Sequence, residues 1–246
     1  MHQKEERLSR MRTMDDSLPT PPRRVAAGIF VLLAAFSALS ALPAWATDVS
    51  GKVRLVSKLS SRKIGKARGD SVPGMEAAEV PAPTESETEN IVIYLDGAGL
   101  SCTPLLKRSI DTSIEQRHKE FLPHVLAVPK GSKVFFENKD AFVHHIYSVS
   151  EPGPFELERF TGRRSEAFNK PGVVEIFCGI HTRMNAYILV LKNNAYTKAQ
   201  KDGSFRISGV PAGNYVLHAW HPRLEKETTQ TVTVPGSGAL KLDLSL

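Results

Sequence analysis

From residue 47 onward, apolar and polar residues alternate in short runs. In "VSGKVRLV" the alternating positions are Val49, Gly51, Val53 and Leu55, and the run "NIVIYLDG" ends in an Asp-Gly turn. A period of two is typical of a β-strand with one buried face, and an Asp-Gly pair favours a tight turn. Five more runs, each bounded by turn residues, follow the same pattern: "HVLAVPKG", "SKVFFENKD", "VHHIYSVS", "VVEIFC" and "AYILVL". We therefore predict an all-β protein built as a sandwich rather than an α/β fold.

A second set of short strands is predicted after residue 200. In "KDGSFRISGVPAGNYVLHAWHP", Phe205 and Ile207 alternate after one turn, and Tyr215, Leu217 and Ala219 alternate after the next. The runs "TVTV" and "ALKLDLSL" predict two more strands. These strands lie outside the first set along the chain, so they indicate a second β-structure.

Residues 57–90 separate the first two predicted strands. The first part of this stretch is basic, and the second part contains the Pro-rich, acidic run "PAPTESETE". Such a composition buries too little apolar surface to offset the entropy of ordering the chain. We predict a mobile loop over residues 57–90.

The N-terminus has the order of parts found in a secretory signal. Arg23-Arg24 precede the apolar run Val25 to Leu42, and Ala44 and Ala46 follow in an A-x-A pattern. An uncleaved membrane anchor is the alternative, since 18 apolar residues almost suffice to span a bilayer. The A-x-A pattern favours cleavage, so we predict a signal peptide over residues 1–46 and a mature chain starting at or near Thr47. The protein would then be periplasmic or otherwise exported, with no membrane span after cleavage.

Composition narrows the classes of partner. The formal net charge is +6, hydrophobic residues make up 41% of the chain, and no run of Lys and Arg is interleaved with aromatic residues. A nucleic acid partner is therefore not expected, and the mildly basic surface fits an acidic protein or an anionic membrane only weakly.

The chain has two cysteines, Cys102 and Cys178. In an exported protein the simplest interpretation is one disulfide between them. The alternative is that Cys178 binds a metal and Cys102 is a free thiol. The stretch "FCGIHTRM" favours the alternative, because it places His181 and Met184 at intervals of three residues after Cys178.

A thiol, an imidazole and a thioether on one short loop are a donor set that suits copper. Thiolate and thioether sulfur favour Cu(I), whereas imidazole serves both oxidation states. A site with two histidines, one cysteine and a weak axial methionine needs one more histidine, and "NKDAFVHHIYS" offers His144 or His145. A structural zinc site would use more thiolates and no methionine, and an iron–sulfur cluster needs more cysteines than the chain has. The remaining alternative is that these residues are ordinary members of the core.

Two segments, "VPKGSKVFFENKDAFVHHIYS" and "PGVVEIFCGIHTRMNAYILVL", resemble the cupredoxins of the plastocyanin, amicyanin and pseudoazurin kind. The resemblance covers roughly residues 110–191, and the Cys-x-x-His-x-x-Met loop is similar to the short loop of amicyanin. The resemblance implies a Greek-key sandwich with one type 1 copper held by His144, Cys178, His181 and Met184. It also implies one-electron transfer to and from redox partner proteins.

One position departs from the cupredoxin pattern. The family usually has an asparagine directly after the first histidine ligand, and this chain has His145 there. Adjacent residues of a strand face opposite ways, so only one of the two histidines can point into the sandwich. The upstream match at Asn138 favours His144. Two roles stay open for His145: it could replace His144 as the ligand, or it could contact the ligands without binding the metal.

The segment "DGSFRISGVPAGNYVLHAW" resembles the carboxypeptidase-regulatory-like module, a small transthyretin-like sandwich also grouped with carbohydrate-binding-like folds. The start of such a module is similar to residues 51–53 and 91–95. We therefore expect the cupredoxin to be inserted in, or fused to, this module. The expected division is a signal peptide at 1–46, the first part of the module at 47–109, the cupredoxin at 110–192 and the rest of the module at 193–246. The combination is similar to proteins described as methylamine-utilisation-like.

We predict an exported blue copper protein that carries single electrons between periplasmic partners. It is not expected to be an enzyme, because the sequence shows neither a nucleophile–base arrangement nor an open metal position. One alternative is a copper carrier or sensor without a redox circuit. Another is a carbohydrate- or protein-binding β-module with a passenger cupredoxin. The sequence does not identify the redox partners, the reduction potential or the oligomeric state.

Overall fold

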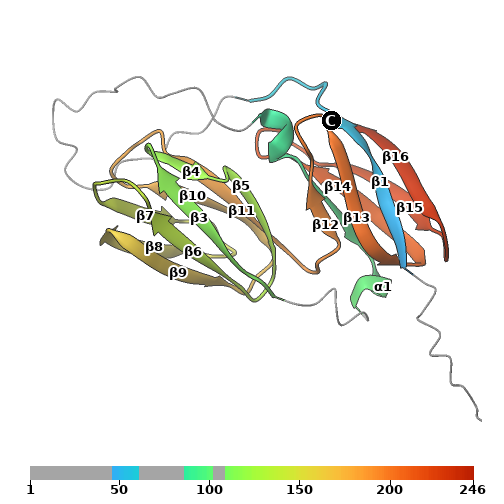
Figure 1. The fold of residues 1–246 in the computed structure, drawn as a ribbon, viewed down its shortest axis with the longest axis horizontal. Helices are drawn as coiled ribbons and strands as arrows, with labels where there is room; N and C mark the ends of the chain where they lie inside the picture. The colour runs from blue at the N-terminus through green and yellow to red at the C-terminus, as the bar shows by residue number, and fades with distance from the viewer. Residues whose placement is uncertain (1–45, 61–85, 102–108) are drawn as a thin grey trace, which may run out of the picture. The chain divides into compact units, whose positions relative to one another are not determined.

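The computed structural model describes residues 46–60, 86–101 and 109–246 (Figure 1). Almost all of the predicted signal peptide, the centre of the predicted mobile loop and Cys102 lie outside the described residues. Within the described ranges, no helix has the length and apolar character needed to cross a bilayer.

The described chain is almost entirely β-structure, which confirms the predicted all-β class. Its strands form four sheets, which pair into two sandwiches with separate apolar cores. The described helical segments are the 3₁₀ turn η1 (Glu87–Asn90) and the short helix α1 (Ala98–Ser101).

One sandwich, named here the Cys178 sandwich, consists of the strands β3 to β11. Its first sheet has the order β4-β3-β6-β9 and its second has the order β5-β11-β10-β7-β8. The bounds are β3 (Asp111–Arg117), β4 (Glu120–Leu122), β5 (Val125–Pro129), β6 (Ser132–Asn138), β7 (His144–Ser148), β8 (Phe155–Phe160), β9 (Gly162–Phe168), β10 (Gly172–Cys178) and β11 (Asn185–Leu191). Strand pairs β3–β6 and β5–β11 are parallel and the others are antiparallel. This arrangement is consistent with the cupredoxin-like sandwich expected from the sequence.

The other sandwich, named here the flanking sandwich, combines two strands from before the Cys178 sandwich with five from after it. Its sheets have the orders β13-β1-β16 and β12-β2-β14-β15. The bounds are β1 (Ala46–Arg54), β2 (Val92–Asp96), β12 (Tyr196–Lys198), β13 (Ser204–Pro211), β14 (Gly213–Trp220), β15 (Thr228–Val234) and β16 (Ala239–Ser245). Strand β1 is antiparallel to β13 and parallel to β16. A Cβ atom at Gly51 would overlap the carbonyl oxygen of Leu242, so glycine permits the close approach of β1 and β16.

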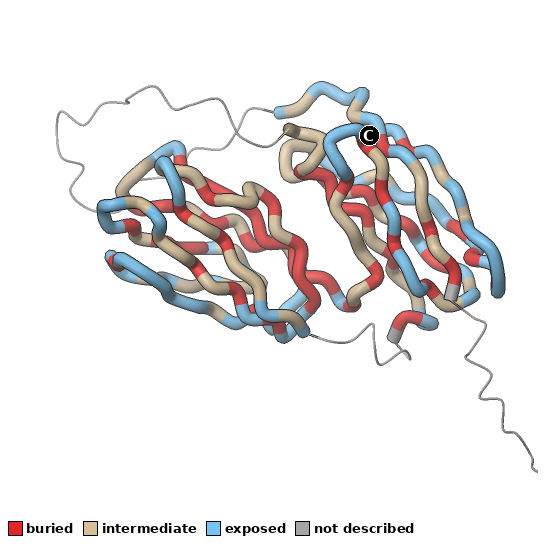
Figure 2. Tube along the Cα trace, in the orientation of Figure 1, coloured by how far each residue is buried: buried red, intermediate tan, exposed pale blue. Residues whose placement is uncertain are grey.

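The period-two pattern of the sequence explains which side chains enter each core. On β10, Val174, Ile176 and Cys178 are buried while the residues between them are only half-buried. On β14, Tyr215, Leu217 and Ala219 are buried in the same way. Figure 2 shows buried positions alternating with more exposed ones along many of the strands. Burial of these apolar faces is the main force that holds each pair of sheets together.

The stretch predicted as one mobile loop, residues 57–90, has structure at both described ends. The backbone N–H of Ser57 donates to the carbonyl of Leu246, and the hydroxyl of Ser60 donates to the carbonyl of Arg223. At the other end, Ser86 and Glu89 form a capping box at the start of η1, in which each side chain accepts from the other's backbone N–H. Residues 61–85 lie outside the described part of the chain.

Candidate metal centre

Two neighbouring strands of the Cys178 sandwich bring a histidine and a cysteine to the same place. Strand β10 ends at Cys178, whose side chain lies on the core face with Ile176. Strand β7 begins at His144 and pairs with β10 in a register that sets Ile146 opposite Cys178. His144 and Ile146 point the same way because they are two residues apart. Both His144 and Cys178 are fully buried.

The loop between β10 and β11 folds back on itself and carries the other two residues of the motif. The backbone N–H of Cys178 donates to the carbonyl of Met184 at 3.0 Å, and the N–H of Met184 donates to the carbonyl of His181 at 3.0 Å. His181 is partly exposed, whereas Met184 is buried in the same core cluster as Cys178. These backbone bonds hold the loop in a tight turn and help to position its side chains.

The donor atoms of His144, Cys178 and His181 all lie within 4.8 Å of one another. The Sγ atom of Cys178 is 3.7 Å from Nδ1 of His144 and 3.6 Å from Nδ1 of His181. With metal–sulfur bonds of about 2.3 Å and metal–nitrogen bonds of about 2.0 Å, two donors on one ion at tetrahedral to trigonal angles are about 3.5–3.7 Å apart. The two sulfur–nitrogen distances therefore match the spacing of donors on a single small ion.

The electrostatics of this cluster favour a thiolate. Burial raises the pKa of Cys178, but hydrogen bonds from His144 and His181 and from backbone N–H groups outweigh it and lower the pKa to about 5. Burial likewise opposes the charged form of His144, yet its contacts with Cys178 and Asp140 raise its pKa. At neutral pH the sulfur is ionised, which is the form that binds metals.

His145 does not join the cluster. Its side chain points away from the core, where Nε2 lies 2.8 Å from Oε1 of Glu156. Its carbonyl accepts the N–H of Gly179 at 2.7 Å, and a Cβ atom at Gly179 would overlap the His145 ring. Of the two adjacent histidines, His144 therefore faces Cys178, while the backbone of His145 binds Gly179 at the start of the loop after β10.

Two neighbours of the cluster were not predicted from the sequence. The carboxylate of Asp140 lies 2.9 Å from Nε2 of His144. The ring of Phe142, which is 41% exposed, packs edge-on at 5.3 Å against both His144 and His181. Both residues belong to the "NKDAFVHH" stretch that identified His144, so their closeness in sequence was the only signal available.

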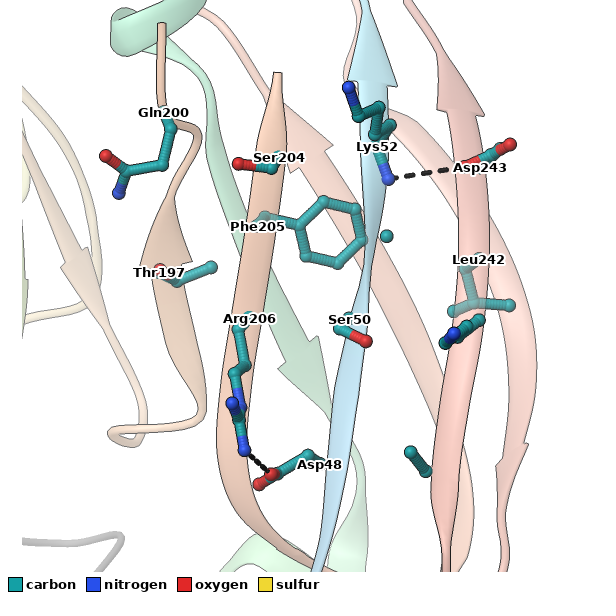
Figure 3. Close-up of a pocket in the computed structure, with 13 residues that line it drawn as sticks. Asp48, Ser50, Lys52, Thr197, Gln200, Ser204, Phe205, Arg206, Leu242 and Asp243 are labelled. Carbon is teal, nitrogen blue, oxygen red and sulfur yellow. Dashed lines mark hydrogen bonds and ion pairs between the residues drawn. The ribbon is translucent and has the colours of Figure 1, made fainter. Parts of the chain in front are cut away.

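The flanking sandwich has a cavity of about 890 Å³ on the sheet β13-β1-β16 (Figure 3). Several of its charged lining residues have protein partners. Arg206 pairs with Asp48, and the backbone N–H of Lys52 donates to Asp243. The ion pair between Arg206 and Asp48 therefore links β13 to β1 within the lining of the cavity.

Comparisons with known proteins find similarity to parts of the chain. Residues 191–241, within and just before the flanking sandwich, match the family described as polysaccharide lyase family 4, domain II. The carboxypeptidase-regulatory-like resemblance stays a prediction. No curated protein matches the chain.

Three solved structures illustrate what part of the chain is similar to. A copper-containing nitrite reductase from Thermus scotoductus SA-01 is 29% identical over 32% of this chain and 22% of its own, with a TM-score of 0.31. A purple cupredoxin from Nitrosopumilus maritimus is 24% identical over 32% of this chain and 98% of its own, with a TM-score of 0.30. A Cu(I) form of an amicyanin mutant is 19% identical over 32% of this chain and 79% of its own, with a TM-score of 0.30. The match therefore spans less than a quarter of the nitrite reductase, and the assignment of the site rests on its own geometry.

Proposed function

We propose that the protein is an exported copper protein that carries single electrons, with one type 1 copper held by His144, Cys178, His181 and Met184. The proposal is carried by one observation. Three donor atoms, provided by β7, β10 and the loop after β10, lie within 4.8 Å of one another. The chemistry of the donor set supports copper, because thiolate and imidazole together suit both of its oxidation states. When bound, copper supplies a one-electron couple between Cu(II) and Cu(I).

The residues of the site have distinct tasks in this proposal. Cys178 provides a buried thiolate and His144 provides a buried imidazole, so both are shielded from water. Met184 is the weak axial ligand that tunes the reduction potential. His181 is partly exposed, and its ring gives a redox partner protein access to the centre. The hydrogen-bonded loop holds the donors in one arrangement for both oxidation states.

Burial also argues against a hydrolytic or thiol-transfer enzyme. Asp140, His144 and Cys178 are in contact in the order that activates a catalytic cysteine. A nucleophile must reach its substrate, however, and the side chain of Cys178 has no exposed surface. We therefore propose a binding role for this thiolate and not a catalytic one.

The remaining parts of the chain complete the proposal. Residues 1–46 serve as the signal peptide, and the protein works in the periplasm or another exported location. The Cys178 sandwich is the cupredoxin, at 110–192. The flanking sandwich, from 47–109 and 193–246, is the module that carries it.

Copper loading followed by voltammetry tests the proposal. The purified chain should bind one copper per molecule and give a reversible one-electron wave. A protein that binds copper stoichiometrically but shows no reversible wave would instead be a carrier or sensor. If the Cys178→Ser variant bound copper as tightly as the wild type, the proposed ligand set would be contradicted.

A further inference from the structure

The ring of His144 lies between the sulfur atom of Cys178 and the carboxylate of Asp140. Its Nδ1 atom is 3.7 Å from the sulfur of Cys178, and its Nε2 atom is 2.9 Å from Oδ2 of Asp140. The His144 side chain is fully buried and that of Asp140 is only 6% exposed. An ionised carboxylate only accepts hydrogen bonds, so Nε2 must carry the proton that it receives. When a metal ion replaces the proton of Nδ1, this other nitrogen is the one that can offer a lone pair to the ion beside Cys178.

Asp140 is itself held in place by the loop that precedes β7. Its backbone N–H donates to Oδ1 of Asn138 at 2.9 Å. Its two carboxylate oxygens accept the backbone N–H groups of His118 at 2.7 Å and of Lys119 at 3.2 Å. The carboxylate is therefore oriented by the hairpin between β3 and β4.

We propose that Asp140 is a positioning residue of the metal centre: it holds the proton on Nε2 of His144, directs Nδ1 at the metal, and favours Cu(II) over Cu(I). The proposal rests on the copper site proposed above. A charge-assisted hydrogen bond is stronger than a neutral one, and it makes the imidazole a better electron donor. The more highly charged ion gains more from such a donor. The low exposure of the pair strengthens this effect, since water does not screen it.

A purely structural role is the competing explanation. His118 and Lys119 have φ angles of 54° and 61°, in the left-handed region that non-glycine residues rarely adopt. By accepting both of their N–H groups, Asp140 also stabilises this turn. Loss of that function alone would lower the stability of the fold, but it would not change the relative affinities for the two oxidation states of copper.

The test compares the carboxylates that contact two adjacent histidines, Asp140 at His144 and Glu156 at His145. Asp140→Asn removes the charge behind His144, and Glu156→Gln removes the charge behind His145, which does not face Cys178. We expect Asp140→Asn to lower the affinity for Cu(II) relative to Cu(I) about tenfold, which raises the potential by about 59 mV for one electron. We expect less than a twofold change for Glu156→Gln. Equal shifts in the two variants would overturn the proposal.

A second variant and a second readout separate positioning from folding. If Asp140→Asn destabilises the hairpin, the same change in a Lys119→Gly background relieves the left-handed strain and keeps the test. In the wild-type protein loaded with Cu(I), NMR should show an Nε2 proton on His144 that exchanges slowly with water, and this protection should be lost in Asp140→Ala, which removes the hydrogen-bond acceptor that asparagine would keep. Unchanged protection would refute the role of Asp140 even if the copper site is correct. Failure of the wild type to bind copper would refute the copper site instead.

Discussion

The two sandwiches of this protein are alike in construction and differ in what they place at the ends of their strands. Each packs two sheets over one apolar cluster. In the Cys178 sandwich, the ends of β7 and β10 add a buried imidazole and a buried thiolate to that cluster. In the flanking sandwich, the buried Asn193 donates a hydrogen bond from its side-chain amide to the carbonyl of Leu95 and accepts one from the backbone N–H of Ala195. The comparison teaches that both regions share a two-sheet construction, and that a few residues at strand ends create a candidate metal centre in one of them.

The largest effects should come from matched cavities in the two cores. Ile176→Ala and Leu217→Ala each truncate a side chain with at most 1% exposure, and each should lower the free energy of unfolding by about 2–5 kcal/mol. Ile176 lies two residues before Cys178 on the same face of β10, so its loss should also weaken copper binding. Leu217→Ala should leave copper binding unchanged. Thermal unfolding and copper titration check both statements, and equal effects on copper binding would break the comparison.

The next largest effect separates the adjacent histidines. His144→Ala should lower copper affinity by more than about 100-fold. Replacing a residue that only hydrogen-bonds to a metal ligand already costs about 10–100-fold in metal affinity or activity. His145→Ala should cost less than about tenfold, because its bond to Gly179 comes from the backbone. Competition with a copper chelator measures both affinities. The reverse order would make His145 the ligand.

A smaller effect is expected at the axial position. Met184→Gln replaces a soft thioether with a harder oxygen, which favours Cu(II). The variant should keep its colour, and its potential should fall by on the order of 59 mV, which is a tenfold change in relative affinity. Spectra and voltammetry of the loaded variant check this. A rise in potential would exclude Met184 as the axial ligand.

The smallest effect concerns a turn of the flanking sandwich. Hydrogen bonds from Ser204, with a contribution from Lys52, lower the pKa of Asp202 to about 2. Because the pKa of Asp202 is lower in the folded state, its ionised carboxylate stabilises the fold. This stabilisation is fully present at pH values above the unfolded-state pKa of about 3.9, and it is lost as the pH falls through about 2. Asp202→Asn should therefore lower the urea midpoint at pH 6 but hardly at pH 2. The same difference at both pH values would show that the carboxylate charge is not responsible.

The sequence allowed the strands and the short loop that carries Cys178, His181 and Met184 to be identified, because both depend on local order along the chain. The run "VVEIFC" was predicted to be a strand, and it lies within β10. The role of Asp140 could not be predicted, because it depends on the conformation of residues 138–144 and on a hairpin from another part of the chain. The left-handed conformations of His118 and Lys119 also lacked a signal, since neither residue is glycine. The parallel pairing of β1 with β16 joins the two ends of the described chain, which no local pattern could indicate.

The visible absorption spectrum of the protein loaded with Cu(II) tests the central claim most directly. A short bond between copper and the thiolate of Cys178 should give intense charge-transfer absorption and a blue or green protein. Cys178→Ser should abolish the colour, because an alcohol is too weak an acid and too hard a donor to replace a thiolate. A wild-type protein that binds copper without colour, or a Cys178→Ser variant with an unchanged spectrum, would contradict the account.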